Sequence, residues 1–279
     1  MISLLRCVRI HPVFWLVIAA GTLTGHLWDT AIAFFIVFVH ELGHAAAAQL
    51  FHWKINEIEL LPFGGVAKFN EREIYPFYQE CVVIIAGPLQ NLWLPLLSYA
   101  MLRFPFWGEN QHAIFLAQNS ALLLFNLLPV WPLDGGRLVD LMLEIAYPFK
   151  QACKRILAFS FGALLLFSGL ALWHFPFSIN LWIILAFIML AIYKEWRVLP
   201  FRFMRFLIAV SVHRGRPMRL KRLIVSRDAP LPQVFAMYYR NAEHRIHIDG
   251  INNSGIDGNE LASQYLSGRC AGTTIGDCR

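Results

Sequence analysis

Residues 31–48 read AIAFFIVFVHELGHAAAA, an apolar run that is interrupted by two histidines and a glutamate. Extended to residues 30–51, the run is long enough for a helix to cross the roughly 30 Å core of a bilayer. Ionisable side chains at that depth are costly unless they face partners or water. The stretch therefore predicts a membrane helix with a polar site on one side.

The whole chain has the composition of a membrane protein. Of its 279 residues, 57% are apolar and 15% are charged, against roughly 45–50% and 25% in a soluble domain. This balance excludes an ordinary soluble enzyme, a fibre and a disordered chain. The net charge of +6 fits cationic loops beside membrane spans, so we expect no direct contact with nucleic acid. Five cysteines without a C-x-x-C pair argue against a disulfide framework or a thiolate zinc cluster.

Hydrophobic segments predict about six transmembrane helices in the lipid bilayer, at residues 12–28, 30–51, 81–102, 113–130, 157–173 and 179–193. Basic residues gather before the first span and after the second, fourth and sixth, which places both termini in the cytosol. The predicted fold class is an all-α polytopic membrane protein with a membrane-associated loop or hairpin around residues 61–65.

The character of the chain changes after Pro200. We expect a transmembrane domain over residues 1–198, a basic linker over 199–222 and a small α/β cytosolic domain over 223–279. A basic segment beside a membrane is typically attracted to anionic headgroups. The last domain is small for independent stability, so pairing with another copy or another chain is expected.

His40 and His44 have the spacing of metal ligands. On a helix, residues i and i+4 share one face, so both imidazoles can reach one ion. Zinc suits two neutral imidazoles and a carboxylate, with a fourth position left open. Glu41 lies beside this row, where it can accept a proton from an attacking water and pass it to a leaving amine. The alternative interpretation is that all three side chains only hydrogen-bond neighbouring helices.

Asp134 is the best candidate for a third ligand. It lies in NLLPVWPLDGG, residues 126–136, where prolines and glycines predict a helix break that leaves a carboxylate at its end. A helix-capping aspartate is the alternative. The second and fourth spans both run toward the cytosol, so the histidine pair and Asp134 are expected to meet on that side.

HELGH in a membrane helix, followed by a distal PLDG, resembles the double signature of the site-2 protease family of intramembrane zinc metalloproteases. The resemblance continues in LPFGG at residues 61–65 and IAGPLQ at residues 85–90. It implies an intramembrane endopeptidase with one Zn²⁺ per chain, in which His40, His44 and Asp134 bind the metal and Glu41 is the general base.

The six-span layout with a cytosolic tail is similar to the sporulation branch of that family. This similarity implies a membrane-associated pro-sigma factor as substrate and membrane proteins as inhibitors or regulators. It also implies a location in the membrane around the forespore, with the cytosolic side in the mother cell.

The tail resembles a cystathionine-β-synthase-type (CBS) domain, through VSRD at residues 225–228 and the segment 244–250. The resemblance implies self-association into a homo-oligomer and an adenine nucleotide as ligand. A docking surface for the substrate is the alternative.

Four more residues are candidates for orienting the substrate. Phe63, Gly64 and Gly65 lie where an edge strand could pair with an extended substrate, although a plain tight turn fits as well. Asn126 could orient the substrate or an oxyanion, and a helix–helix hydrogen bond is its simpler interpretation. Gly87, followed by proline, predicts a kink or close packing without a chemical role.

Two other functions stay open. A membrane-anchored zincin of the CAAX-processing type, acting on soluble or lipidated chains, needs a downstream glutamate ligand, for which Glu144 is the nearby candidate. A non-catalytic metal-binding, transport or regulatory membrane protein is the other. The intact Glu41 argues against it, because a storage site needs no general base.

Overall fold

The computed structural model describes residues 8–10, 18–19, 21–53, 55–61, 64–69, 75–174, 178–212, 219–240, 242–249, 255–269 and 274–275. The chain forms two compact units. Unit 1 comprises Met1–Asn70, Tyr75–Pro129 and Leu133–Leu138, and unit 2 comprises Glu71–Ile74, Val130–Pro132 and Val139–Arg279.

Unit 1 is built on three long helices, α3 (Leu27–Leu50), α4 (Phe77–Met101) and α5 (Glu109–Asn126), each of which packs against the other two. Their shared core includes Ile36, Leu94 and Phe115. Large apolar side chains such as Leu96 and Leu124 remain exposed on the outer faces. An apolar exterior around a packed interior is what a lipid environment requires, because lipid tails are as apolar as leucine.

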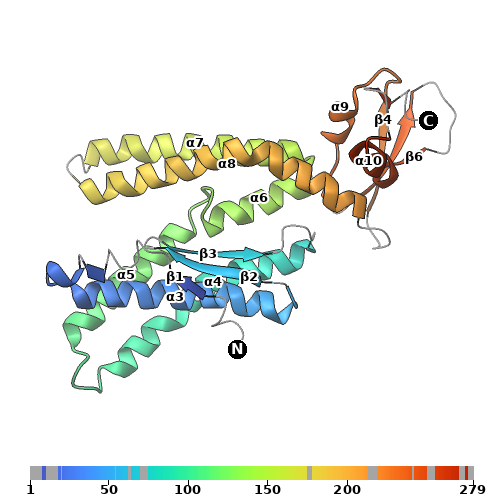
Figure 1. Ribbon diagram of the computed structural model, residues 1–279. Coiled ribbons are helices and arrows are strands. Elements are labelled where there is room, and N and C mark those ends of the chain that lie inside the picture. Colours follow the sequence, from blue (N-terminus) through green and yellow to red (C-terminus); the bar gives the residue numbers. More distant parts are fainter. Residues whose placement is uncertain are drawn as a thin grey trace. The chain divides into compact units, whose positions relative to one another are not determined.

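A small sheet lies along α3 in unit 1 (Figure 1). Its order is β1 (Val8–Ile10), β2 (Ile55–Leu61) and β3 (Gly64–Phe69). β1 runs parallel to β2, and β3 runs antiparallel to β2, with Leu61 opposite Gly64. The hairpin predicted around residues 61–65 is therefore present, and in the described sheet β3 is an edge strand.

Unit 2 contains α7 (Phe149–His174) and α8 (Ile179–Val212), which lie side by side (Figure 1). α8 continues as one helix through Pro200 to Val212. Arg202 on this extension binds Glu195, at 2.8 Å between Nη1 and Oε1, and is only a quarter exposed. This arginine of the predicted basic linker is therefore held within the protein.

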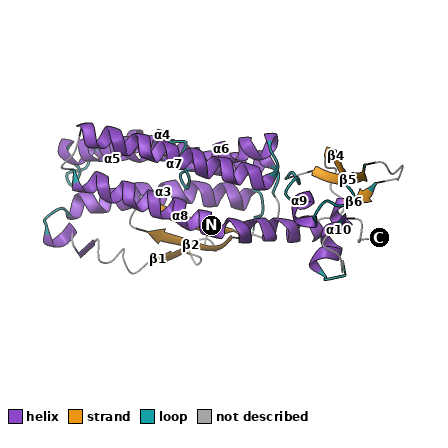
Figure 2. Ribbon diagram, turned by 90° about the horizontal axis from the view of Figure 1, so that it is seen from above, coloured by secondary structure: helices purple, strands orange, loops and turns teal. Residues whose placement is uncertain are grey.

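The carboxy-terminal region of unit 2 has the order β4 (Arg219–Val225), α9 (Leu231–Phe235), β5 (Ala242–Ile248), β6 (Ile256–Asp257) and α10 (Gly258–Leu266). β4 and β5 are parallel, and β6 is antiparallel to β5. Figure 2 shows these short strands with α9 and α10 beside them. Alternate residues of β5 are buried, so Ile246 and Ile248 face a core with Leu261. The predicted small region of mixed strands and helices is thus present.

Three helices of the described chain are long and apolar enough to cross a membrane: α3, α4 and Phe149–Trp173 of α7. They correspond to the second, third and fifth predicted spans, and they support a membrane protein. The fourth predicted span falls on α5 and the sixth on the first half of α8. Of the first, residues 12–28, positions 12–17 and 20 lie outside the described residues.

Candidate metal centre

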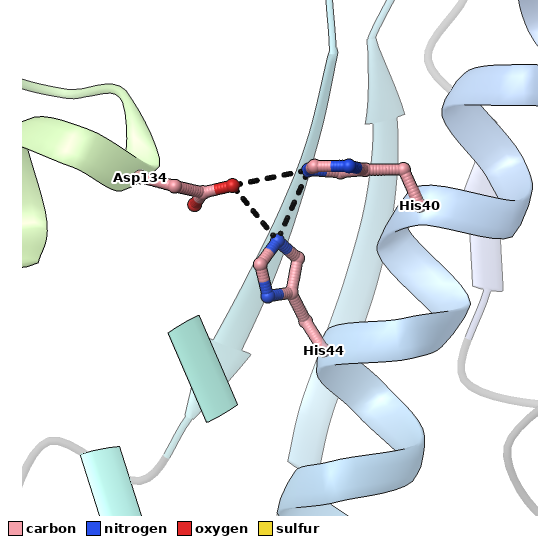
Figure 3. Close-up of side chains that lie close together, drawn as sticks. All are labelled: His40, His44 and Asp134. Carbon is pink, nitrogen blue, oxygen red and sulfur yellow. Dashed lines mark hydrogen bonds and ion pairs between the residues drawn. The ribbon is translucent and has the colours of Figure 1, made fainter. Parts of the chain in front are cut away.

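His40 and His44 project from one side of α3, and Asp134 reaches toward them from the start of α6 (Asp134–Ala146) (Figure 3). Oδ2 of Asp134 lies 3.1 Å from Nε2 of His40 and 3.3 Å from Nε2 of His44. The two Nε2 atoms are 3.2 Å apart. All three side chains are buried. Three potential ligand atoms thus form a nearly equilateral triangle in the protein interior.

The size of this triangle fits a zinc ion. Zinc binds imidazole nitrogen and carboxylate oxygen at about 2.0–2.2 Å, so neighbouring ligand atoms in a tetrahedral site are roughly 3.3–3.5 Å apart. The separations of 3.1–3.3 Å agree with that spacing to within the usual tolerance. His40, His44 and Asp134 therefore form a group that could hold one metal ion.

Hydrogen bonds on the far side of each ring set the protonation of the histidines. Nδ1 of His44 donates to the carbonyl oxygen of Val83 at 2.8 Å, and Nδ1 of His40 donates to Oδ1 of Asn91 at 2.8 Å. Each neutral ring therefore carries its proton on Nδ1 and presents a lone pair on Nε2. Two lone pairs and a carboxylate converge on one point, an arrangement that a cation stabilises and that is repulsive without one.

Asn91 on α4 is itself held by Asn119 on α5. Nδ2 of Asn91 donates to Oδ1 of Asn119 at 3.0 Å, and Nδ2 of Asn119 returns a bond of 2.8 Å to the Asn91 carbonyl oxygen. Both amides are buried. Such outer partners fix the tautomer and the ring orientation of metal-binding histidines. A continuous chain of hydrogen bonds thus links His40 to two further helices.

Glycines make room for the site. A Cβ atom on Gly87 of α4 would collide with the ring of His44, and one on Gly135 of α6 would collide with the carbonyl oxygen of Leu127. Gly87 therefore lets α4 carry the Val83 carbonyl up to His44. Gly135 lets α6 begin close behind α5, which brings Asp134 to the histidines.

The other predicted site residues that the structure describes lie on α3, at the end of α5 and at the start of β3. Glu41 is buried and adjacent to His40 on α3. Asn126 is the half-buried last residue of α5, Gly64 and Gly65 begin β3, and Phe63 lies outside the described residues.

The sequence interpretation missed Asn91 and Asn119, the amides that support His40. One signal was available for Asn91. It is an amide in an apolar span and follows Gly87 by one helical turn, so it shares the face of that glycine.

Glu144, the ligand that the zincin alternative needs, is bound elsewhere. Nη1 of Arg240 donates to its Oε2 at 2.6 Å. Potential ligand atoms of Glu144, Asp140 and Cys153 also lie within 4.8 Å of one another. Arginines, however, supply the positive charge beside these two carboxylates. The carboxylate that accompanies the histidine pair is that of Asp134, and this favours the first interpretation over the zincin.

Comparisons with known proteins agree with this geometry. The model of peptidase family M50 matches residues 30–114 and 108–169. Stage IV sporulation protein FB of Bacillus subtilis is 34% identical over 269 residues, which are 95% of this chain and 93% of that protein. A zinc metalloprotease of Methanocaldococcus jannaschii is 32% identical over 131 residues, 44% of this chain and 38% of that protein.

A solved structure is also similar. The site-2 protease from Methanocaldococcus jannaschii matches with a TM-score of 0.53 and 25% identity, over 67% of this chain and 89% of that one. The residues that the family model matches include His40, His44 and Asp134. The similarity therefore covers the metal centre itself.

Proposed function

Because this chain belongs to peptidase family M50 and is an intramembrane zinc metalloprotease of the site-2 protease type, we propose that it cleaves a membrane-associated pro-sigma factor. The observation that carries the proposal is the similarity to stage IV sporulation protein FB, which extends over 95% of this chain. The Methanocaldococcus jannaschii enzyme, in contrast, matches 44% of it. The sporulation relative thus shares the carboxy-terminal region as well as the protease region.

We assign His40, His44 and Asp134 as the metal ligands and Glu41 as the general base. A zinc ion held by these three residues would lower the pKa of a water molecule and polarise a peptide carbonyl. Glu41 accepts the proton of the attacking water and returns it to the leaving amine, as a carboxylate next to the ligand row can. Asn91 and the Val83 carbonyl hold both rings so that each Nε2 faces the same point.

The edge strand β3 supports a mode of substrate binding. It lies beside α3, the helix that carries both histidines. An extended substrate can add to such an edge through main-chain hydrogen bonds. Gly64 and Gly65 begin this strand without side chains that would hold another backbone away. A substrate helix must unwind before it binds in this way, because its carbonyls are otherwise bonded within the helix.

The proposed setting is a six-span protein with both termini in the cytosol, in the membrane around the forespore. Exposed apolar residues on α5 and α8, such as Leu124 and Leu190, support the fourth and sixth spans. Membrane inhibitors, a homo-oligomer and an adenine nucleotide bound by a CBS-like tail stay predictions.

The test is co-expression with a panel of membrane-associated precursors that includes a sigma-factor precursor. Each precursor is paired with the wild-type chain, with Glu41→Gln, and with Glu109→Gln as a control at an exposed glutamate. We expect a shortened sigma factor with the wild type and the control only. A product that also forms with Glu41→Gln contradicts the assigned base, and processing of other precursors alone contradicts the proposed substrate.

A further inference from the structure

Unit 2 contains a buried group of charges that the proposed reaction does not use. This charged cluster consists of Asp140 and Glu144 on α6, Glu195 and Arg202 on α8, and Arg240 from the carboxy-terminal region. Nη2 of Arg202 lies 3.5 Å from Oδ2 of Asp140. Arg202 also lies over the ring of Trp131, at 5.1 Å from the centroid.

Arg240 joins the carboxy-terminal region to α6. Its Nη1 donates to Oε2 of Glu144 at 2.6 Å, and the Glu144 side chain is 1% exposed. Hydrogen bonds between ionised groups are short and strong in this way. A second contact lies beside the first, because the backbone N–H of Phe149 donates to the carbonyl of Tyr238 at 2.9 Å. Residues 238–240 thus hold the last turn of α6 and the first residue of α7.

The charge balance makes the Arg240 contact important. The cluster has three carboxylates and two guanidinium groups, and the close ion pair of Glu144 is with Arg240. Burial, and then the charge of Glu144, raise the pKa of Asp140. Without Arg240, a carboxylate that water does not reach would lose its ion-pair partner, which is strongly destabilising.

α6 connects this contact to the metal centre. Asp134 is its first residue and Glu144 lies in its last turn, about 15 Å away at the rise of an α-helix. Gly135 packs closely against the carbonyl oxygens of Leu127 and Leu128. The start of α6 is thus held at Gly135, and its last turn is held by the ion pair of Glu144 with Arg240.

We propose that Arg240 is a positioning residue of the protease: by binding Glu144 it fixes the last turn of α6 and so the direction in which Asp134 is presented to the histidine pair. The inference rests on the proposed role of Asp134 as a metal ligand. It makes the carboxy-terminal region a support of the active site.

The test uses the full chain in detergent, loaded with zinc, and compares Arg240→Gln, Glu144→Gln and the double variant. Arg245→Gln, an exposed arginine on β5, is the matched control. Zinc loss to a chelator is timed, and precursor cleavage is measured in parallel. We expect Arg240→Gln to lose zinc roughly tenfold faster, the lower end of the effect for a partner that supports a metal ligand. The double variant should restore the wild-type rate to within about twofold, because two amides can bond without a buried charge.

Each outcome separates the inference from the proposed function. Unchanged zinc loss in Arg240→Gln overturns the inference, and so does rapid loss that the double variant does not correct. A wild-type chain that binds no zinc overturns the metal site instead. If Arg240→Gln does not fold, the charge-swapped pair Arg240→Glu with Glu144→Arg replaces it, and recovery of zinc retention in the swapped pair is the expected result.

Discussion

The metal centre of unit 1 and the charged cluster of unit 2 are built from similar buried residues but differ in how their charge is balanced. At the metal centre, Oδ1 of Asn91 and the Val83 carbonyl oxygen accept hydrogen bonds from the Nδ1–H groups of the two rings, so the Nε2 lone pairs converge on Asp134. In the charged cluster, guanidinium groups bind Asp140 and Glu144 directly. A buried carboxylate can therefore bind a metal ion where its neighbours are histidines that present lone pairs. Where an arginine forms an ion pair with it, the carboxylate stabilises the fold instead.

The largest effect is expected from removing the carboxylate of the metal centre. Asp134→Ala should weaken zinc binding on the order of a hundredfold or more, since the roughly 10–16 kcal/mol of a structural zinc site is about 3–4 kcal/mol for each of its four ligands. The counterpart in the charged cluster is Glu195→Gln, which should leave the metal content unchanged. Metal analysis of both purified proteins checks this difference. Equal zinc in the two variants would remove the distinction between the regions.

Filling the space beside His44 should come next in size. Gly87→Ala places a methyl group against the ring of His44, so the ring must turn away from Asp134. We expect zinc affinity to fall on the order of 100-fold, the upper end for loss of a residue that orients a ligand. Gly162→Ala on α7 is the matched control, because its new Cβ meets open space. Competition with a chromogenic chelator measures the zinc affinity of both variants. Equal affinities would show that α4 can shift away from His44 to make room for the methyl group.

Variants of two asparagines can distinguish a residue that supports a metal ligand from one that contacts the substrate. Asn91→Leu should lower zinc affinity about tenfold by freeing the His40 ring. Asn126→Leu should leave zinc affinity unchanged and, if Asn126 orients the substrate, reduce cleavage alone. Chelator competition and a cleavage assay on the same samples distinguish the two results. A tenfold loss of zinc affinity in Asn126→Leu would show that Asn126, at the end of α5, supports the metal ligands.

The smallest expected effect concerns a third buried histidine, His244, which lies in the carboxy-terminal region. Nε2 of His244 accepts the N–H of Tyr239 at 2.9 Å, so its lone pair is used by the backbone. Burial, and then the charge of Lys221, lower the pKa of His244 to about 4.

The depressed pKa of His244 gives a pH dependence with a definite sign. The unfolded chain takes up a proton below pH 6.5 and the folded chain only near pH 4, so stability falls as the pH drops through that window. Between pH 7 and 5.5 the loss is about 1 kcal/mol. Thermal unfolding of the carboxy-terminal region measures it, and His244→Gln should abolish this part of the slope. An unchanged slope would show that another group titrates.

The sequence alone could predict the parts of the site that depend on local geometry. Two histidines four residues apart share a helix face in any fold, and a carboxylate after a proline-rich break is a recognisable third ligand. Asn91 and Asn119 could not be predicted in the same way, because their role depends on which faces α3, α4 and α5 turn toward one another.

The fold shows the same division between local and distant information. Hydrophobic length predicted the segments of α3, α4 and α7. The pairing of Glu144 with Arg240 joins residues 96 positions apart. It depends on where the carboxy-terminal region docks, which no local pattern encodes. From the sequence Glu144 is therefore a possible metal ligand, and the structure shows it in an ion pair with Arg240.

The hydrogen-bond chain from His40 through Asn91 to Asn119 has a consequence for biogenesis. It joins one side chain from each of α3, α4 and α5, and bonds of this kind between membrane helices contribute about 0.6–2 kcal/mol. The ring of His40 acquires its final orientation only after all three helices have been inserted and have met. A metal site with this ring orientation therefore requires the assembled three-helix unit and cannot form on α3 alone.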